Sequence, residues 1–249
     1  MVFGRRKRHS EKTGPGAGGH EARGQEAAAD EAAVDEAADG RVEGLRRNGP
    51  FDSSEKAGAD GYLDLGALRI LPREGLQLRL EVEENTQRVV AVTLDYGGSS
   101  LQLQAFAAPK SEGLWDEIRG QIGSSVGSEG GTVEEIEGPL GTEVVARLPV
   151  QMPDGQRGYR VARFLGVDGP RWFLRGVIGG PAALDREQGA VLEEMFRSTI
   201  VVRGDAPMPP RDLLVLRLPQ GATRERPAAP APGPRLAAPE RGPEITEIG

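Results

Sequence analysis

Alternating apolar and polar residues dominate the middle of the chain and predict β-strands. Between residues 76 and 83, leucine and valine alternate with glutamine, arginine and glutamate, and residues 101–106 repeat the pattern. This period of two is typical of strands with one buried and one solvated face. Further strands are expected at about 62–70, 88–95, 132–137, 141–148, 158–165, 171–178 and 199–202, with a last edge strand at 213–218. The short connections favour antiparallel pairing, because parallel strands need a long crossover.

Two other segments have their apolar residues at helical spacing. The first helix is expected over 112–122, with Ser111 as its N-cap, and the second begins at Gly179-Gly180-Pro181. Their apolar stripes consist of Leu114, Trp115, Ile118 and Ile122 in the first helix and of Leu184, Val191, Leu192, Met195 and Phe196 in the second. We therefore predict an α+β fold, in which a central antiparallel sheet is flanked by two helices and Trp115 and Trp172 lie in the core.

Glycine, proline and alanine crowd the two ends of the chain. The sequence has 36 Gly and 19 Pro among 249 residues, and Pro and Ala repeat at 227–232. Segments of this kind lack the apolar residues needed for a packed core. We expect a disordered head over 1–50, a single α+β domain over 51–219 and a disordered tail over 220–249.

Charge is arranged in blocks along the chain. The head opens with the basic run 5–9, and residues 21–43 then hold eight acids against two arginines. Within the domain, residues 51–143 carry seven basic and seventeen acidic residues (net −10), whereas 144–219 carry eleven arginines and eight acids (net +3). The resulting −7 argues against nucleic-acid binding by the domain, because phosphate neutralisation dominates such binding. The basic run leaves open, as an alternative, that the head associates with nucleic acid or an anionic membrane.

The domain contains neither histidine nor cysteine. The chain has no Cys, and His9 and His20 both lie in the head. Imidazole acid–base catalysis, serine–histidine triads, thiol nucleophiles and ordinary zinc sites are therefore excluded from the domain. We predict no cofactor and no metal site, and we expect a non-enzymatic protein.

A histidine-free hydrolase or transferase that uses carboxylates and arginine is the alternative. The available acids are Glu134, Glu135, Glu137, Asp154 and Asp168. Their spacing matches neither a D-x-D motif nor an EF-hand loop, so Glu134 and Glu135 are interpreted as part of a solvated strand face. The segment Gly123–Gly127 matches the nucleophile-elbow pattern G-x-S-x-G, but it follows a predicted helix rather than a strand, and we interpret it as a flexible linker.

The hairpin of strands 158–165 and 171–178 carries the candidate binding residues. If residues 166–169 form the connecting loop, the cross-strand pairs are Arg160–Arg175, Ala162–Phe173 and Phe164–Arg171. Cross-strand partners share a face, so three guanidinium groups would lie beside two aromatic rings. We predict a binding site for an acidic protein partner or a small anion, made of Arg160, Arg171, Arg175, Phe164 and Phe173. In two alternatives, acids of the same domain satisfy these arginines, or a one-residue register shift scatters them.

Five sequence blocks together resemble an actinobacterial family that contains a single domain of unknown function. The blocks are Arg47–Asp52, Leu101–Pro109, Gly113–Ile118, Gly166–Gly176 and Val202–Pro210, and the Val-Asp-Gly-Pro-Arg-Trp-Phe-Leu-Arg run in the fourth is specific. The resemblance spans about 45–220 and implies a bacterial protein from a high-GC lineage, without transferring any catalytic residue or cofactor. The order of strands and helices is also similar to the class of the photosystem-II extrinsic protein and the nuclear-import factors, whose members are mostly non-enzymatic binding modules.

Together these observations predict a cytoplasmic, non-enzymatic binding or adaptor protein. No apolar run reaches the length needed to cross a bilayer, and the basic start of the chain is not followed by the apolar region of a signal peptide. The hairpin arginines are the expected contact surface for its partner.

Overall fold

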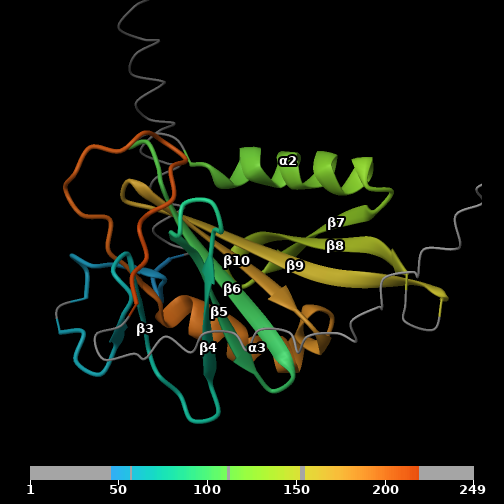
Figure 1. Ribbon diagram of the computed structural model, residues 1–249, viewed down its shortest axis with the longest axis horizontal. Helices are drawn as coiled ribbons and strands as arrows, with labels where there is room; N and C mark the ends of the chain where they lie inside the picture. The colour runs from blue at the N-terminus through green and yellow to red at the C-terminus, as the bar shows by residue number, and fades with distance from the viewer. Residues whose placement is uncertain (1–45, 57, 111–112, 152–154, 219–249) are drawn as a thin grey trace, which may run out of the picture. The chain divides into compact units, whose positions relative to one another are not determined.

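The domain is built on a seven-stranded antiparallel sheet (Figure 1). The computed structural model describes residues 46–56, 58–110, 113–151 and 155–218. The strand order of the large sheet is β4-β5-β6-β10-β9-β8-β7. Its strands are β4 (Gln77–Val82), β5 (Val89–Tyr96), β6 (Ser99–Ala107), β7 (Thr132–Gly138), β8 (Gly141–Gln151), β9 (Arg157–Gly169) and β10 (Trp172–Gly179). The predicted strands between 76 and 178 are confirmed, and their pairing is antiparallel as expected.

A second, smaller sheet joins the two ends of the domain. It consists of four short strands, β1 (Phe51–Asp52), β2 (Leu63–Asp64), β3 (Leu68–Ile70) and β11 (Ile200–Val201), in the order β1-β11-β3-β2. Strand β1 runs parallel to β11, with Phe51 opposite Ile200. The predicted edge strand at 213–218 forms only isolated bridges, through Leu213 and Leu216.

Two α-helices are present among the described residues, α2 (Trp115–Ser128) and α3 (Arg186–Ser198), and a short 3-10 helix, η1 (Pro181–Ala183), precedes the second. The first helix is longer than predicted. Residues 123–127, interpreted as a flexible linker, form its last turns, so that interpretation is wrong. The second helix begins at Arg186, later than the predicted start at 179–181, and Leu184 of the predicted stripe precedes it and is exposed. The remaining pattern is confirmed, with Leu192, Met195 and Phe196 buried.

The predicted fold class is wrong. We predicted an α+β arrangement in which two helices flank one central sheet. The described chain is instead mostly β and contains two sheets. The small sheet was predicted only in part: the strand expected at 62–70 covers β2 and β3, and the one expected at 199–202 covers β11. Strand β1 was missed because its two residues are too few to show alternation. The pairing of these short strands also joins segments far apart in the sequence, and a local pattern cannot reveal such contacts.

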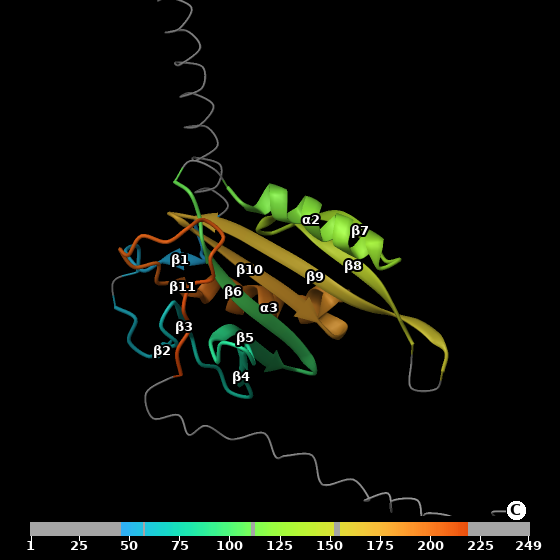
Figure 2. The ribbon, with the colours of Figure 1, turned by 45° about the horizontal axis from the view of Figure 1, so that its top comes forward.

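The two faces of the large sheet are covered very differently. We call the face that carries Phe106, Phe164 and Phe173 the front face, and the opposite one the back face. On the back face, apolar residues of β6 and β10 pack with α3 in the main core, as the fully buried Phe196 and Trp172 show. On the front face, α2 lies mainly across β7, β8 and β9 (Figures 1 and 2), and at its start Trp115 also stacks on Phe173 of β10. Most of the front-face half formed by β4, β5, β6 and β10 therefore lies outside the area that α2 covers.

Candidate functional site

The hairpin that carries the predicted site residues has a different turn from the predicted one. Pro170 and Arg171 form the turn, and residues 166–169, predicted as a loop, are the last residues of β9. The three predicted cross-strand pairs, Arg160–Arg175, Ala162–Phe173 and Phe164–Arg171, are therefore wrong. The observed partners are Gly166 for Arg175, Asp168 for Phe173 and Val177 for Phe164.

Two glycines explain why β9 continues through a segment with the composition of a loop. A β-carbon on Gly166 would overlap the ring of Trp115, and one on Gly169 would overlap the ring of Trp172. Glycine inside a strand often marks such a close approach. In the sequence the same glycines resemble turn signals, which placed the predicted turn too early.

The new register keeps four of the five predicted site residues on one face, but only three of them lie together. Phe164, Phe173 and Arg175 all lie on the front face, because their β9–β10 pairs alternate with those of the back face. Arg160 lies on the part of β9 that extends beyond the end of β10 and is exposed. Arg171 lies in the turn, with a φ of 62°. The predicted cluster of three guanidinium groups is therefore absent from the described structure, and Arg175 is the arginine that stays with the aromatic rings.

Arg175 is held against an aromatic ring and an amide rather than a carboxylate. Its guanidinium carbon lies 5.6 Å from the centroid of the Phe106 ring. Nη2 of Arg175 donates a hydrogen bond to Oε1 of Gln104, the residue opposite it on β6, whereas Nε is buried without a hydrogen-bond partner. Burial lowers the pKa of Arg175, because desolvation disfavours the charged form. An anionic group brought to this guanidinium would supply the partner that it lacks.

Acids of the same domain do not neutralise the predicted arginines. Within the described ranges, no carboxylate forms an ion pair with Arg160, Arg171 or Arg175. Carboxylates of the acid-rich half of the domain instead form ion pairs with other arginines, for example Glu134 with Arg147 at 3.2 Å. The predicted charge is thus available on the protein surface, although it is not concentrated in one cluster.

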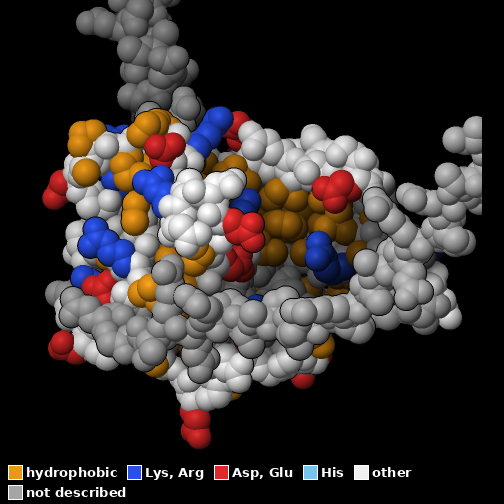
Figure 3. Space-filling view, viewed as in Figure 1, with side chains coloured by type: hydrophobic (Ala, Val, Ile, Leu, Met, Phe, Trp, Pro, Cys, Tyr) orange, Lys and Arg blue, Asp and Glu red, His pale blue; other side chains and the backbone are white. Residues whose placement is uncertain are grey.

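The uncovered half of the front face forms a groove beside α2, which we call the front groove (Figure 3). Helix α2 packs through Leu114 and Trp115 against Phe173 and Val144. The Trp115 ring stacks on Phe173 with centroids 6.0 Å apart. Next to this cluster, the following front-face or helix side chains are only partly buried: Phe106, Ile118, Ile122, Ala162, Phe164 and Val177. The space-filling view shows apolar side chains in the hollow and charged side chains of both signs around it.

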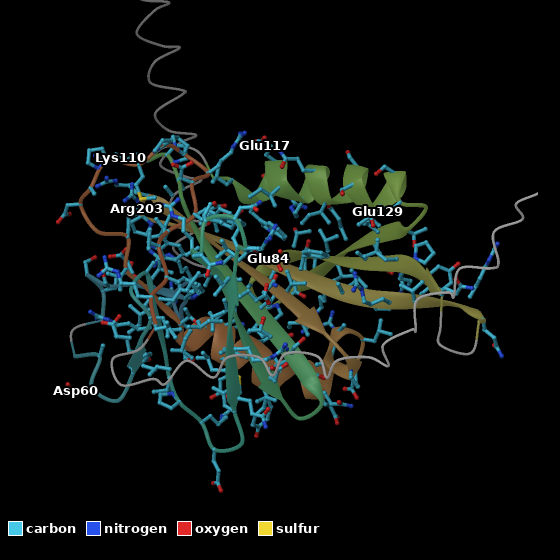
Figure 4. The ribbon with its side chains drawn as sticks, in the orientation of Figure 1. Asp60, Glu84, Lys110, Glu117, Glu129 and Arg203 are labelled. Carbon is cyan, nitrogen blue, oxygen red and sulfur yellow. The ribbon has the colours of Figure 1, made fainter. Side chains whose placement is uncertain are left out.

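Polar side chains line the groove on the side of β4 and β5. Glu81 accepts hydrogen bonds from Thr93 Oγ1 at 2.6 Å and from Gln102 Nε2 at 2.8 Å. Arg79 forms an ion pair with Asp95. Figure 4 shows the elements around the groove: Glu117 and Glu129 lie near the two ends of α2, and Glu84 belongs to the turn between β4 and β5. These polar groups satisfy one another, whereas Arg175 keeps a buried donor without a partner.

The sequence prediction missed Gln104 and Phe106, which position Arg175. The alternation in residues 101–106 places both on the same face of β6 as Gln102. Their position next to Arg175 depends on the pairing of β6 with β10. These two strands are separated by more than sixty residues along the chain. The alternation therefore indicated which face of the strand Gln104 and Phe106 occupy. It could not indicate that this strand pairs with β10.

Those carboxylates of the alternative, enzymatic prediction that the structure describes do not converge. Glu135 forms an ion pair with Arg119 at 2.9 Å, and Glu137 accepts a hydrogen bond from Thr142. Asp168 accepts hydrogen bonds from the backbone N–H groups of Leu114, at 2.7 Å, and Trp115, at 3.2 Å, at the start of α2. Burial raises the pKa of Asp168, and these two hydrogen bonds oppose the rise. Asp168 is thus explained as the residue that anchors α2.

Three predictions concern residues that the structure does not describe. Asp154, the Ser111 N-cap and the basic run 5–9 all lie outside the described residues. In place of Ser111, the side chain of Asp168 binds the first free N–H groups of α2 from another strand. The groups that could have made Gly179-Gly180 an anion site are also engaged within the domain, because Ala182 N–H donates to Ser99 Oγ at 3.1 Å.

A separate hollow of about 410 Å³ lies near Gly180, at the end of β5 and β6 opposite to Phe106. It is lined by Gly75, Gln77, Asp95, Tyr96, Ser100 and the glycines of the β5–β6 turn. Its carboxylate, that of Asp95, already binds Arg79 at 2.5 Å. The lining therefore offers backbone and small polar groups but no unpaired charge.

The sequence blocks that carry the family resemblance meet around the turn between β9 and β10. Asp52 accepts a hydrogen bond from Trp172 Nε1 at 2.8 Å, and the Arg46 guanidinium lies 5.6 Å from the Trp172 ring. Arg203 Nε donates to the backbone oxygen of Arg171 at 3.2 Å. Asp168, in the same region, anchors α2. These blocks therefore connect both ends of the domain and the helix α2 to the β9–β10 hairpin.

The chain belongs to a family whose domain has no assigned function. Residues 49–225 match the family model described as "Protein of unknown function (DUF3710)". This confirms the resemblance to a family with a single domain of unknown function. No curated protein matches the chain.

The similarity to the photosystem-II extrinsic class is present but weak. The solution structure of cyanobacterial PsbP (CyanoP) from Synechocystis sp. PCC 6803 matches with a TM-score of 0.34 and 11% identity, covering 59% of this chain and 97% of that one. A match of this quality supports no conclusion about function. Among the described residues, no group of three or more His, Cys, Asp or Glu is arranged to hold a metal ion, and no helix is long and apolar enough to span a bilayer.

Proposed function

We propose that this chain is a non-enzymatic, cytoplasmic binding protein whose front groove holds an acidic, partly apolar segment of a partner protein. In this proposal, a carboxylate of the partner binds the guanidinium of Arg175. Apolar side chains of the partner cover Phe106, Phe164 and Val177. The proposal narrows the predicted surface from three arginines to one, because Arg160 and Arg171 lie elsewhere.

The environment of Arg175 is the observation that carries the proposal. A partly buried guanidinium with one buried donor unpaired costs free energy, since polar groups removed from water need a replacement partner. A carboxylate bound beside the guanidinium would pair its charge, and a shift of the side chain would let it reach the buried Nε donor as well. Hydrogen bonds between charged groups contribute about 1.5–3 kcal/mol, more than neutral ones.

The shape of the front groove favours a chain segment over a small molecule. Small-molecule sites are usually concave pockets that enclose most of the ligand. The front groove instead combines an open apolar floor with polar groups along one side (Figure 3). Such a surface suits an amphipathic helix or an extended segment that presents apolar and acidic side chains together.

Titration with an acidic peptide tests this function. We expect a synthetic peptide of mixed leucine, alanine and glutamate to bind the full-length protein more tightly than an analogue with glutamine in place of glutamate. Arg175→Gln should weaken binding of the acidic peptide by about 10-fold to 100-fold, because it removes the charged partner. Isothermal titration calorimetry measures both affinities.

Arg160→Gln and Arg171→Gln are the matched controls. Both remove an arginine that lies outside the front groove, so the affinity for the acidic peptide should stay within about twofold at moderate salt. Urea unfolding of each variant shows whether the fold is intact. Equal losses for all three arginines would indicate general charge attraction, and an unchanged affinity for Arg175→Gln would refute the proposed site.

A further inference from the structure

A buried cluster of charged side chains lies on the back face, between α3 and strands β8 and β9. Glu143 of β8 is 1% exposed and Arg163 of β9 is 3% exposed. Arg163 Nη2 donates a hydrogen bond of 2.6 Å to Glu193 Oε1 on α3. The distance from Arg163 Nε to Glu143 Oε2 is 3.7 Å, too long for a hydrogen bond. One buried arginine is thus shared by two acids, and Glu193 has the better contact.

The carboxyl group of Glu143 has no hydrogen-bond partner among the described residues. Both of its oxygen atoms are buried, and neither accepts a hydrogen bond. Two glycines leave room for the cluster: a β-carbon on Gly138 would overlap the Glu143 carboxyl, and one on Gly189 of α3 would come within 2.6 Å of Arg163 Nη2. The backbone is therefore shaped to hold these two side chains.

Two more cations of α3 surround the cluster, but each is engaged elsewhere. Arg186 Nη2 donates to the backbone oxygen of Glu137 at 3.2 Å, and Arg197 Nη2 donates to that of Pro139 at 3.1 Å. The charged groups that act on Glu143 are therefore Arg163 from β9 and Glu193, Arg186 and Arg197 from α3. Burial of the carboxyl raises the pKa of Glu143 to about 7. Repulsion from Glu193 adds to this rise, and the attraction of the three arginines does not offset it.

We propose that Glu143 is a protonation latch between α3 and the large sheet. While its carboxyl is neutral, α3 stays packed on β8 and β9. Once the carboxyl ionises, its free energy is lower in water than in the buried site. Helix α3 then opens locally to admit water. The proposal is independent of the front groove, because the cluster lies on the back face.

The direction of the pH effect follows from the raised pKa. A carboxyl with a higher pKa in the packed state than in the open state favours packing when it is protonated. The stabilisation of α3 is therefore complete below the ordinary pKa of glutamate, 4.5, and is lost as the pH rises through about 7. Between pH 6 and pH 8, we expect the local opening of α3 to increase about tenfold.

Amide hydrogen exchange of the full-length protein measures this opening directly. After correction for the intrinsic exchange rate, protection of the α3 amides around Leu192 and Phe196 should fall about tenfold from pH 6 to pH 8. Protection of Val92 and Leu103, in β5 and β6, should not change. A drop of equal size across all strands, or no drop in α3, would overturn the latch.

Two variants separate the latch from a general loss of packing. Glu143→Gln removes the ionisation but keeps the shape, so α3 protection should become independent of pH over this range. Glu193→Gln removes the competing acid and frees Arg163 to pair with Glu143, so the drop should become smaller than in the native protein. If Glu143→Gln shows the same pH dependence as the native protein, another group is responsible and the proposal fails.

Discussion

Replacing Arg163 by methionine is expected to lower the free energy of unfolding by about 3–5 kcal/mol, because it leaves two acids at a buried position without a cation. Arg163 is the only cation in the described structure that forms an ion pair with Glu143 or Glu193. Both partners are largely buried, with side-chain exposures of 2% and 12%. Urea unfolding near pH 8, where Glu143 is mostly ionised, measures the effect.

The matched control is Arg147→Met, which breaks an exposed ion pair. Arg147 and Glu134 have side-chain exposures of 40% and 59%, so their pair should contribute less than about 1 kcal/mol. Replacing Arg163, Glu143 and Glu193 together by apolar residues should recover most of the loss, because no charge then remains buried. A cost below about 1 kcal/mol for Arg163→Met would show that the cluster is solvated and that the burial argument is wrong.

Replacing Trp115 by alanine should cost a similar amount, about 3–5 kcal/mol, and should release α2 from the sheet. Trp115 is 7% exposed, stacks on Phe173 and donates a hydrogen bond of 2.7 Å to the backbone oxygen of Thr142. Its ring also occupies the space above Gly166. Because α2 forms one side of the front groove, hydrogen exchange along α2 should increase together with the loss of stability.

Trp115→Phe is the conservative variant for this prediction. It keeps an aromatic ring against Phe173 but loses the hydrogen bond to Thr142, so a cost of about 1–2 kcal/mol is expected. Hydrogen exchange should then remain slow in α2. If α2 stays equally protected in Trp115→Ala, the helix is held by other contacts, and the groove does not depend on this residue.

Local patterns predicted the strands of the large sheet but not the way they are assembled. The alternation of residues 76–83 and 101–106 identified β4 and β6, since a half-buried strand leaves a signal within a few residues. Strand β1 gave no such signal, and although a strand was predicted at β11, the pairing of these two strands depends on the packing of distant segments. The fold class was therefore wrong although most of the longer strands were right.

The candidate site shows the same division between local and long-range information. Phe164, Phe173 and Arg175 share a face as predicted, because the partner of Phe164 moves from Arg171 to Val177, an even shift that keeps the two strands in phase. Arg160 and Arg171 were misplaced, since the turn position depends on Trp115 packing over Gly166. The sequence also gave no indication of the Glu143–Arg163 contact, because a charged residue in a strand normally indicates a solvated position.

The side-chain Nε–H resonance of Arg175 provides the most direct test of the proposed binding site. In a nitrogen–proton correlation spectrum, assigned by its loss in Arg175→Gln, this resonance should shift when the leucine–alanine–glutamate peptide is added. The glutamine analogue should cause no comparable shift, and the resonances of Arg160 and Arg171 should stay in place. If the acidic peptide binds while the Arg175 resonance does not move, its carboxylates bind elsewhere and the front groove is not the site.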